Sequence, residues 1–321
     1  MKDSKLIPGA EPSPKLDRRQ LLKCGAWAGT GLLWTMAGGV PVASALARTS
    51  LSGSAGFRFV QISDSHIGFH KEANPDANAT LQAAMDQVVD LRPQFVLHTG
   101  DVSHLSKVEE FDTAQQIVGT YRGEVHYVPG EHDVIGDNGK TFFERFNGST
   151  DRKWYSFDAG GVHFVGLVNV LDLQAGGFGR LGGDQLEWLE RDLKHRSAST
   201  PLVIFTHMPL WTVYPDWGWG TDDATQALSY VRRFGSVTVL NGHIHQVLQK
   251  VEGHVKFFTA MSTAFPQPAP GAAPSPGPMK VPAETLRHVL GIREVSYQGK
   301  HNPLLVNDRT LDHVDSARGA A

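Results

Sequence analysis

The residues of this chain that can do chemistry gather in five short stretches, each directly after a run of apolar residues. The stretches are Asp64-x-His66, Gly100-Asp101, Gly130-Glu131-His132, His207 and Gly242-His243-x-His245. Carboxylate oxygens and imidazole nitrogens are the donors that transition metals accept, and glycine lets the backbone turn tightly beside them. Eight potential donors are too many for one ion. They suit a pair of metal ions that share a bridging carboxylate.

Each stretch taken alone has an ordinary structural explanation. An aspartate at the end of a strand is commonly a turn residue or a helix cap, and a single histidine is usually a satisfied or solvated polar group. The five stretches occur together, however, and every one follows an apolar run. That regularity favours one common site.

Strand and helix patterns place all five stretches at strand ends. Apolar strand patterns cover 57–63, 94–98, 125–128, 201–205 and 237–240, a hairpin pattern joins 153–157 to 162–168, and one further strand is expected at 292–297. Helical spacing covers 76–89, 108–121 and 183–193. The alternation predicts an α/β fold with a largely parallel sheet. Ligands of such sheets bind outside the carboxyl ends of the strands, so the five stretches are expected to converge.

The ordered motif set resembles the calcineurin-like metallophosphoesterase family. FVQISDSHIG, LGGDQLEWLERDL, FTHMPL and NGHIHQ are similar to the branch that contains class III cyclic-nucleotide phosphodiesterases, glycerophosphodiesterases and purple acid phosphatases. The similarity spans about residues 57 to 260. It implies a four-layer α-β-β-α sandwich, in which two mixed sheets flanked by helices bear a two-metal site.

The resemblance also implies a role for each motif residue. The first metal is expected to bind Asp64, His66, Asp101 and His245. The second is expected to bind Asp101 as the bridge, Glu131, His207 and His243. His132 is expected near the leaving-group oxygen as the catalytic imidazole, whereas His98 and His104 have no ligand role in the family pattern. Two ions of Fe, Mn or Zn per chain are the implied cofactors.

These roles predict a metal-dependent phosphoric ester hydrolase that acts on a small-molecule phosphodiester or phosphomonoester, with the diester favoured. Two neighbouring cations lower the pKa of a bridging water, so that hydroxide is available to attack near neutral pH. The cations also bind phosphoryl oxygens and stabilise the charge that develops. His132 is expected to assist the departing alkoxide.

Glu131 departs from the family pattern, which has Gly-Asn-His where this chain has Gly130-Glu131-His132. Glutamate offers an anionic oxygen where asparagine offers a neutral one, which favours hard ions such as Fe or Mn and reduces the charge of the centre. Three interpretations follow. Glu131 is a ligand of a variant phosphoesterase, or it turns away and leaves an open coordination position, or the chain is a non-catalytic metal-binding or sensing protein on the same fold. The presence of His132 favours an enzyme.

Four aromatic residues crowd the loop after His207. Trp211, Tyr214, Trp217 and Trp219 are candidates for a pocket wall that stacks on a base or a sugar. The alternative is packing of the loop on the core.

The first 47 residues have the features of a twin-arginine export signal. Asp17-Arg18-Arg19-Gln20-Leu21-Leu22-Lys23 precedes a Gly/Ala-rich apolar run, and Ala45-Leu46-Ala47 supplies small residues for cleavage. An uncleaved N-terminal anchor is the alternative. The predicted division is a signal at 1–47 and a phosphoesterase domain at 48–321, with a core at 57–260, a proline-rich loop at 265–282 and an extension at 283–321. A periplasmic or secreted protein follows, with the export machinery as partner and no stable membrane anchor.

Composition limits the other classes of function. The chain has 321 residues, 40% of them hydrophobic, and a net charge of −3; without residues 1–47, 24 basic and 30 acidic residues remain, a net charge of −6. No basic stripe of the kind that binds nucleic acid is present. The only cysteine, Cys24, lies in the predicted signal, so the remaining chain forms neither disulfides nor thiolate metal sites.

Overall fold

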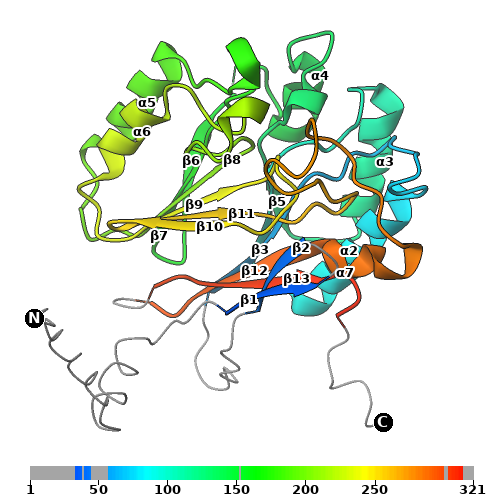
Figure 1. Ribbon diagram of the computed structural model, residues 1–321. Coiled ribbons are helices and arrows are strands. Elements are labelled where there is room, and N and C mark those ends of the chain that lie inside the picture. Colours follow the sequence, from blue (N-terminus) through cyan, green and yellow to red (C-terminus); the bar gives the residue numbers. More distant parts are fainter. Residues whose placement is uncertain (1–32, 38–39, 45–56, 152, 300–302, 314–321) are drawn as a thin grey trace, which may run out of the picture.

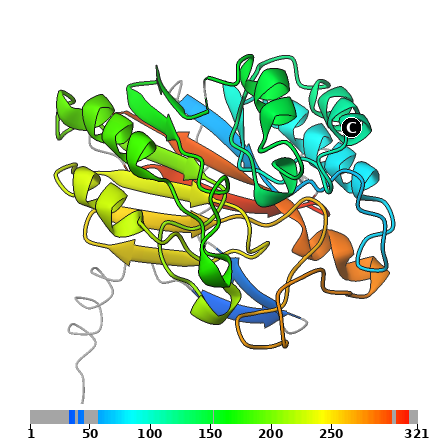
Figure 2. The same ribbon diagram turned by 90° about the horizontal axis from the view of Figure 1, so that it is seen from above.

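Two mixed β-sheets pack face to face with helices on their outer sides (Figures 1 and 2). The structure is a computed structural model that describes residues 33–37, 40–44, 57–151, 153–299 and 303–313. The predicted four-layer α-β-β-α sandwich is confirmed.

The first sheet has six strands in the order β10-β11-β9-β8-β7-β6. Its strands are β6 (Tyr155–Ala159), β7 (Val162–Gly166), β8 (Leu202–Thr206), β9 (Val237–Asn241), β10 (Gln249–Glu252) and β11 (Val255–Thr259). The four inner strands run parallel, and the outer strands β6 and β10 pair antiparallel with their neighbours. Parallel strands buried on both faces require continuous apolar runs, such as the fully buried β8.

The second sheet has five strands in the order β13-β12-β3-β4-β5. Its strands are β3 (Phe57–Ile62), β4 (Phe95–His98), β5 (Glu124–Tyr127), β12 (Gly291–Tyr297) and β13 (Leu305–Thr310). Strands β3, β4 and β5 run parallel, whereas β12 is antiparallel to β3 and β13 is antiparallel to β12. Within the predicted extension, strands β12 and β13 therefore belong to the sheet that carries β3.

Helices cover the outer face of each sheet (Figure 2). Helices α2 (Ala77–Leu91) and α3 (Val108–Val118) pack on the five-stranded sheet, and α5 (Gly183–Lys194) and α6 (Ala224–Val231) pack on the six-stranded sheet. The Asp76 side chain caps α2 by accepting a hydrogen bond from the Ala79 N–H, and Pro93 follows the end of the helix. Two short helices, α4 (Lys140–Phe142) and α7 (Leu286–Val289), lie in connections.

Aromatic residues fill the space between the two sheets. Phe59 and Phe95 of one sheet meet Phe164 of the other, and the ring centroids of Phe59 and Phe164 are 5.2 Å apart. Neighbouring residues along each strand face opposite layers: Phe258 joins this central core, whereas Phe257 packs toward the helices. This packing fixes the position of one sheet relative to the other. It therefore also fixes the relative positions of the loops at the strand ends.

A buried polar network ties strand ends of both sheets together beneath those loops. The Gln61 amide donates to Thr99 Oγ1 at 2.9 Å and to the Asn241 carbonyl at 3.3 Å. The buried Arg293 guanidinium, paired with Asp308, supports Gln61 from β12. Buried polar groups need such partners, so the network specifies how the two sheet edges meet.

The predicted segments agree with the described ones in type and place, but the sequence analysis did not predict helices α4, α6 and α7 or strands β10, β11 and β13. Residues 265–282 contain neither helix nor strand. Of the predicted export signal, residues 1–32, 38–39 and 45–47 lie outside the described residues. Within it the structure describes β1 (Leu33–Ala37) and β2 (Val40–Ser44), which pair antiparallel as a separate sheet. No helix in the described part of the chain is long and apolar enough to cross a membrane.

Candidate metal centre

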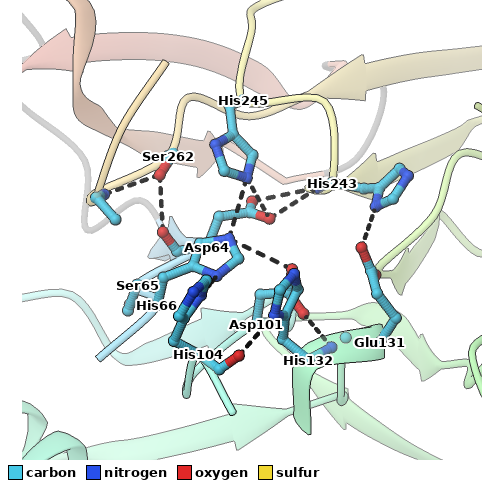
Figure 3. Close-up of polar contacts among 12 residues, drawn as sticks. Asp64, Ser65, His66, Asp101, His104, Glu131, His132, His243, His245 and Ser262 are labelled. Carbon is cyan, nitrogen blue, oxygen red and sulfur yellow. Dashed lines mark hydrogen bonds and ion pairs between the residues drawn. The ribbon is translucent and has the colours of Figure 1, made fainter. Parts of the chain in front are cut away.

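The five predicted stretches meet at the carboxyl ends of β3, β4, β5, β8 and β9. Figure 3 shows the residues of four of them, which follow β3, β4, β5 and β9. Main-chain hydrogen bonds hold the loops together in pairs. The amide of Asp64 donates to the Gly100 carbonyl at 2.9 Å, that of His66 donates to Asp101 at 2.8 Å, and that of Gly242 donates to His207 at 3.1 Å. The convergence expected from the strand pattern is therefore present.

Backbone strain is concentrated in these loops. Eight non-glycine residues among those described have a positive φ, and five of them belong to the cluster. These five are Asp64 (54°), His66 (40°), Asp101 (53°), His243 (67°) and His245 (55°). Left-handed backbone at residues with side chains costs free energy and persists where the surroundings enforce it, which is characteristic of functional sites.

Two glycines allow the loops to approach one another. A Cβ atom on Gly130 would collide with the Asp101 carboxylate, and one on Gly242 would collide with Ser63 Oγ and the Asp64 carboxylate. Glycine is required at both places because the backbone itself packs against proposed ligands.

One half of the cluster contains Asp64, His66 and His245, all at least 97% buried. His245 Nε2 lies 3.2 Å from Asp64 Oδ1 and 3.3 Å from His66 Nε2. Ring nitrogens and carboxylate oxygens within this distance of one another are positioned to share one ion.

The other half contains Glu131, His207 and His243. Glu131 Oε2 lies 2.8 Å from His207 Nε2, and Glu131 Oε1 lies 3.0 Å from His243 Nδ1. Glu131 Oε2, His207 Nε2 and His243 Nδ1 are nevertheless buried without a partner in hydrogen-bond geometry. Buried polar atoms of this kind are rare in native proteins, and here they converge on one another. The donor set therefore fits a metal ion, and the Glu131 carboxylate lies between the rings of His207 and His243.

Asp101 stands between the two halves. Its Oδ2 atom lies 3.4 Å from His66 Nε2 and 3.4 Å from His207 Nε2, one from each half. Its Oδ1 atom accepts a hydrogen bond from the His132 amide at 2.9 Å. Asp101 therefore contacts ring nitrogens of both halves.

Backbone carbonyls orient the histidine rings. His207 Nδ1 lies 2.7 Å from the Thr99 carbonyl oxygen, and His245 Nδ1 lies 2.6 Å from that of Phe265. Each Nδ1 therefore donates its proton to a carbonyl, and Nε2 is the ring nitrogen that faces the cluster. Such outer contacts fix the tautomer that a metal ligand needs.

Burial and neighbouring charges shift the pKa values of three residues in the cluster. Burial opposes a charge on His207, but the carboxylates of Asp101 and Glu131 raise its pKa well above its usual range. Burial alone would raise the pKa of Glu131, but the positive charges of His243 and His207 hold it well below its usual range. Burial, with the neighbouring His245 and His132, lowers the pKa of His66 well below its ordinary value, which keeps this ring neutral and free to ligate.

Metal binding by the metal-free protein is expected to depend on pH. A raised pKa keeps His207 protonated, and a metal must displace that proton. The ion pair with Glu131 stabilises the metal-free fold below the folded-state pKa of His207 and is lost as the pH rises through it. The apparent metal affinity should therefore rise about tenfold per pH unit for each proton displaced until that pKa is passed.

Competition titrations against a chromophoric chelator across the neutral pH range measure this slope. Glu131→Gln removes a charge that raises the pKa of His207, so the variant should show a shallower slope as well as weaker binding. An affinity that does not change with pH in the wild type would contradict the protonation of His207.

His132 lies at the rim of the cluster. Its Nδ1 donates to the His104 carbonyl at 2.6 Å, and its ring stands edge-on to that of His66 at 4.7 Å. Burial lowers the pKa of His132, but Asp101 and Glu131 outweigh it and the net direction is upward. The following residue, Asp133, is buried and accepts hydrogen bonds from Gly130, Val102 and Ser103, so it ties the loop after β5 to the loop after β4.

The four aromatic residues after His207 occupy two places. Trp211 packs near Phe257 and lines a cavity of about 580 Å³ between α6 and the β10–β11 hairpin, whose lining includes none of the eight cluster residues. Trp217 lies edge-on to Tyr214 and to Trp219, with ring centroids 5.1 and 4.9 Å apart, and Trp219 is buried in the core. Packing therefore accounts for Trp219, whereas Tyr214 reaches toward Gly271 of the proline-rich loop.

Several residues that shape the cluster were not predicted. Phe265 stacks on His66 with ring centroids 4.7 Å apart, and Gln267 donates to the His243 carbonyl at 2.8 Å. Ser262 Oγ donates to the carbonyl of Asp64 at 2.7 Å. The segment after β11 thus packs directly on the proposed ligands.

Comparison with known proteins places these features in a family. The model of the calcineurin-like phosphoesterases matches residues 57–247, which is more than half of the chain. A 3′,5′-cyclic-nucleotide phosphodiesterase of Nostoc is 26% identical over 215 residues, which cover 64% of this chain and 77% of that protein. A glycerophosphodiester phosphodiesterase of Enterobacter lignolyticus is 25% identical over 233 residues, covering 70% and 82%.

Solved structures share the fold. A dimetal phosphatase of Danio rerio superposes with a TM-score of 0.61 at 17% identity, covering 79% of this chain and 96% of that one. The similarity supports the arrangement of the two sheets and their helices.

Proposed function

The chain belongs to the calcineurin-like phosphoesterase family, and we propose that it is an exported two-metal phosphoesterase that hydrolyses a small-molecule phosphodiester or phosphomonoester. The observation that carries the proposal is the pair of donor groups joined by Asp101, one of which holds three buried polar atoms without hydrogen-bond partners. Export rests on the sequence features of residues 1–47 alone.

The proposed ligands fall into two sets, one for each half of the cluster. Asp64, His66, Asp101 and His245 would hold the first ion, and Asp101, Glu131, His207 and His243 would hold the second. When bound, two such cations supply an activated water and bind the phosphoryl oxygens of the substrate. Because Glu131 adds an anionic oxygen, we propose hard ions, Fe or Mn, ahead of Zn.

His132 is the proposed proton donor. Water adds to phosphorus, the bond from phosphorus to the leaving oxygen breaks, and that oxygen takes a proton. The Nδ1 of His132 is occupied by the His104 carbonyl, so Nε2 is the atom that would deliver the proton. The raised pKa of His132 supports this role, because a protonated imidazole is available near neutral pH.

A phosphodiester is the substrate we favour. The relatives from Nostoc and Enterobacter lignolyticus are named as phosphodiesterases of cyclic nucleotides and glycerophosphodiesters. A proton donor is also most useful when the leaving group is an alkoxide, as in a diester of an aliphatic alcohol.

A non-catalytic metal-binding or sensing protein is the second candidate, and Glu131 is the observation that favours it. Its carboxylate contacts both His207 and His243. With this anionic ligand, the net charge of a metal centre bound there would be one unit less positive than with a neutral ligand. A lower charge weakens the attraction of the centre for a phosphoryl group.

Metal content and hydrolysis, measured on the same preparation, separate the two candidates. The purified protein is analysed for Fe, Mn and Zn and assayed with matched bis- and mono-substituted phosphates of one alcohol. We expect two ions per chain and faster turnover of the diester. Two bound ions without hydrolysis of any ester would favour the binding protein, and no bound ion after metal loading would contradict both candidates.

A further inference from the structure

His104 lies beside both His66 and His132 (Figure 3). Main-chain hydrogen bonds fix its place, because the His104 amide donates to the Ile67 carbonyl at 2.9 Å and the Ile67 amide donates to Val102 at 3.0 Å. The loop that carries His104 therefore runs in register with the loop that carries His66. Their relative position does not depend on the contacts between side chains.

Three contacts join His104 to the two neighbouring rings. His104 Nδ1 lies 3.5 Å from His66 Nδ1. The His104 carbonyl accepts from His132 Nδ1 at 2.6 Å, and the two rings stack with centroids 5.0 Å apart and planes 15° apart. Phe69 packs edge-on against His104 at 5.3 Å.

The nitrogen of His66 that faces His104 is the one that the cluster does not use. His66 Nε2 faces His245 and Asp101, so a metal bound there leaves the ring proton on Nδ1. That N–H needs an acceptor. The rings of His207 and His245 donate to backbone carbonyls, whereas the atom that faces His66 Nδ1 is the imidazole nitrogen of His104.

We propose that His104 is a positioning residue that holds His66 and His132 through two separate contacts. Its Nδ1 lone pair accepts the proton of His66, and its ring stacks on His132 and fixes the plane in which that imidazole works. The inference rests on the proposed function, because it assumes that His66 ligates and that His132 delivers a proton.

The two contacts can be separated by substitution. His104→Phe keeps a ring that stacks but removes the acceptor. His104→Asn keeps an acceptor near the position of Nδ1 but removes the ring. The matched control is His70→Phe, which makes the same change at an exposed histidine of the neighbouring loop.

Metal affinity and turnover should then rank the variants in opposite orders. His104→Phe should weaken the binding of one of two metal equivalents by about 10–100-fold, the usual cost of losing an outer contact of a ligand, while kcat at saturating metal stays close to wild type. His104→Asn should bind both equivalents within a few-fold of wild type but lose kcat. A purely structural role would move both quantities together and would lower the melting temperature of the metal-free protein.

Chelator competition, kcat at saturating metal and melting of the metal-free protein test this directly. The inference is overturned if both variants bind metal like wild type, or if both lose affinity and kcat in parallel. A wild-type protein without metal would overturn the proposed function as well. If the wild type binds two ions and His104→Phe binds metal with the same affinity as the wild type, this inference alone is overturned.

Discussion

Replacing Asp101 with alanine is expected to remove at least one of the two metal ions and to lower activity by more than about 10³-fold, beyond the 10–100-fold cost of an outer contact. Asp101 contacts both halves of the cluster, because its Oδ2 atom lies 3.4 Å from Nε2 of His66 and 3.4 Å from Nε2 of His207. It also accepts the His132 amide through Oδ1, so the change loosens the proposed proton donor at the same time.

Asp101→Asn tests whether charge or shape matters. Asparagine retains an oxygen for the His132 amide but removes the negative charge between the two cations. We expect metal loss close to that of alanine, measured as metal content after dialysis, with the exposed Asp112→Ala as the control. Full metal content in both Asp101 variants would show that the two metal ions do not share the Asp101 carboxylate as a ligand.

Replacing His132 with alanine is expected to leave metal content unchanged and to lower kcat by about 10²–10⁴-fold for a substrate with an alkoxide leaving group. His132 contacts the cluster through its backbone amide and its ring edge, and its Nδ1 is committed to the His104 carbonyl. A proton donor matters less when the leaving group is already acidic, so a nitrophenyl ester should lose much less activity.

The comparison of leaving groups makes this result specific. The exposed His254→Ala serves as the control for loss of an imidazole elsewhere. Equal losses for alkyl and nitrophenyl esters would point to misplacement of the substrate. Full activity with the alkyl ester would remove His132 from the mechanism.

Much of the site could be predicted because it follows from strand periodicity. Apolar runs that end in Asp64, Asp101, Glu131, His207 and His243 are visible in the sequence, and parallel strands bring their carboxyl ends to one edge. The fold followed from the same pattern combined with the family resemblance. The strands β10 and β13 were not predicted because they are partly polar edge strands whose pairing depends on the sheet already formed.

The supporting contacts could not be predicted, since several of them use main-chain atoms. The carbonyls of Thr99, His104 and Phe265 orient His207, His132 and His245, and any residue type could supply a carbonyl. The aromatic loop divides between the two alternatives that the sequence left open. Trp219 is buried in the core, whereas Trp211 lines the cavity beside α6.

Anomalous diffraction from crystals loaded with Mn or Fe tests the central claim most directly. The account predicts two peaks about 3.5–4 Å apart, the spacing of two-metal hydrolytic sites, on either side of Asp101. One peak should lie among Asp64, His66 and His245, and the other among Glu131, His207 and His243. A single peak, or a second peak with the Glu131 carboxylate turned away from it, would contradict the proposed centre.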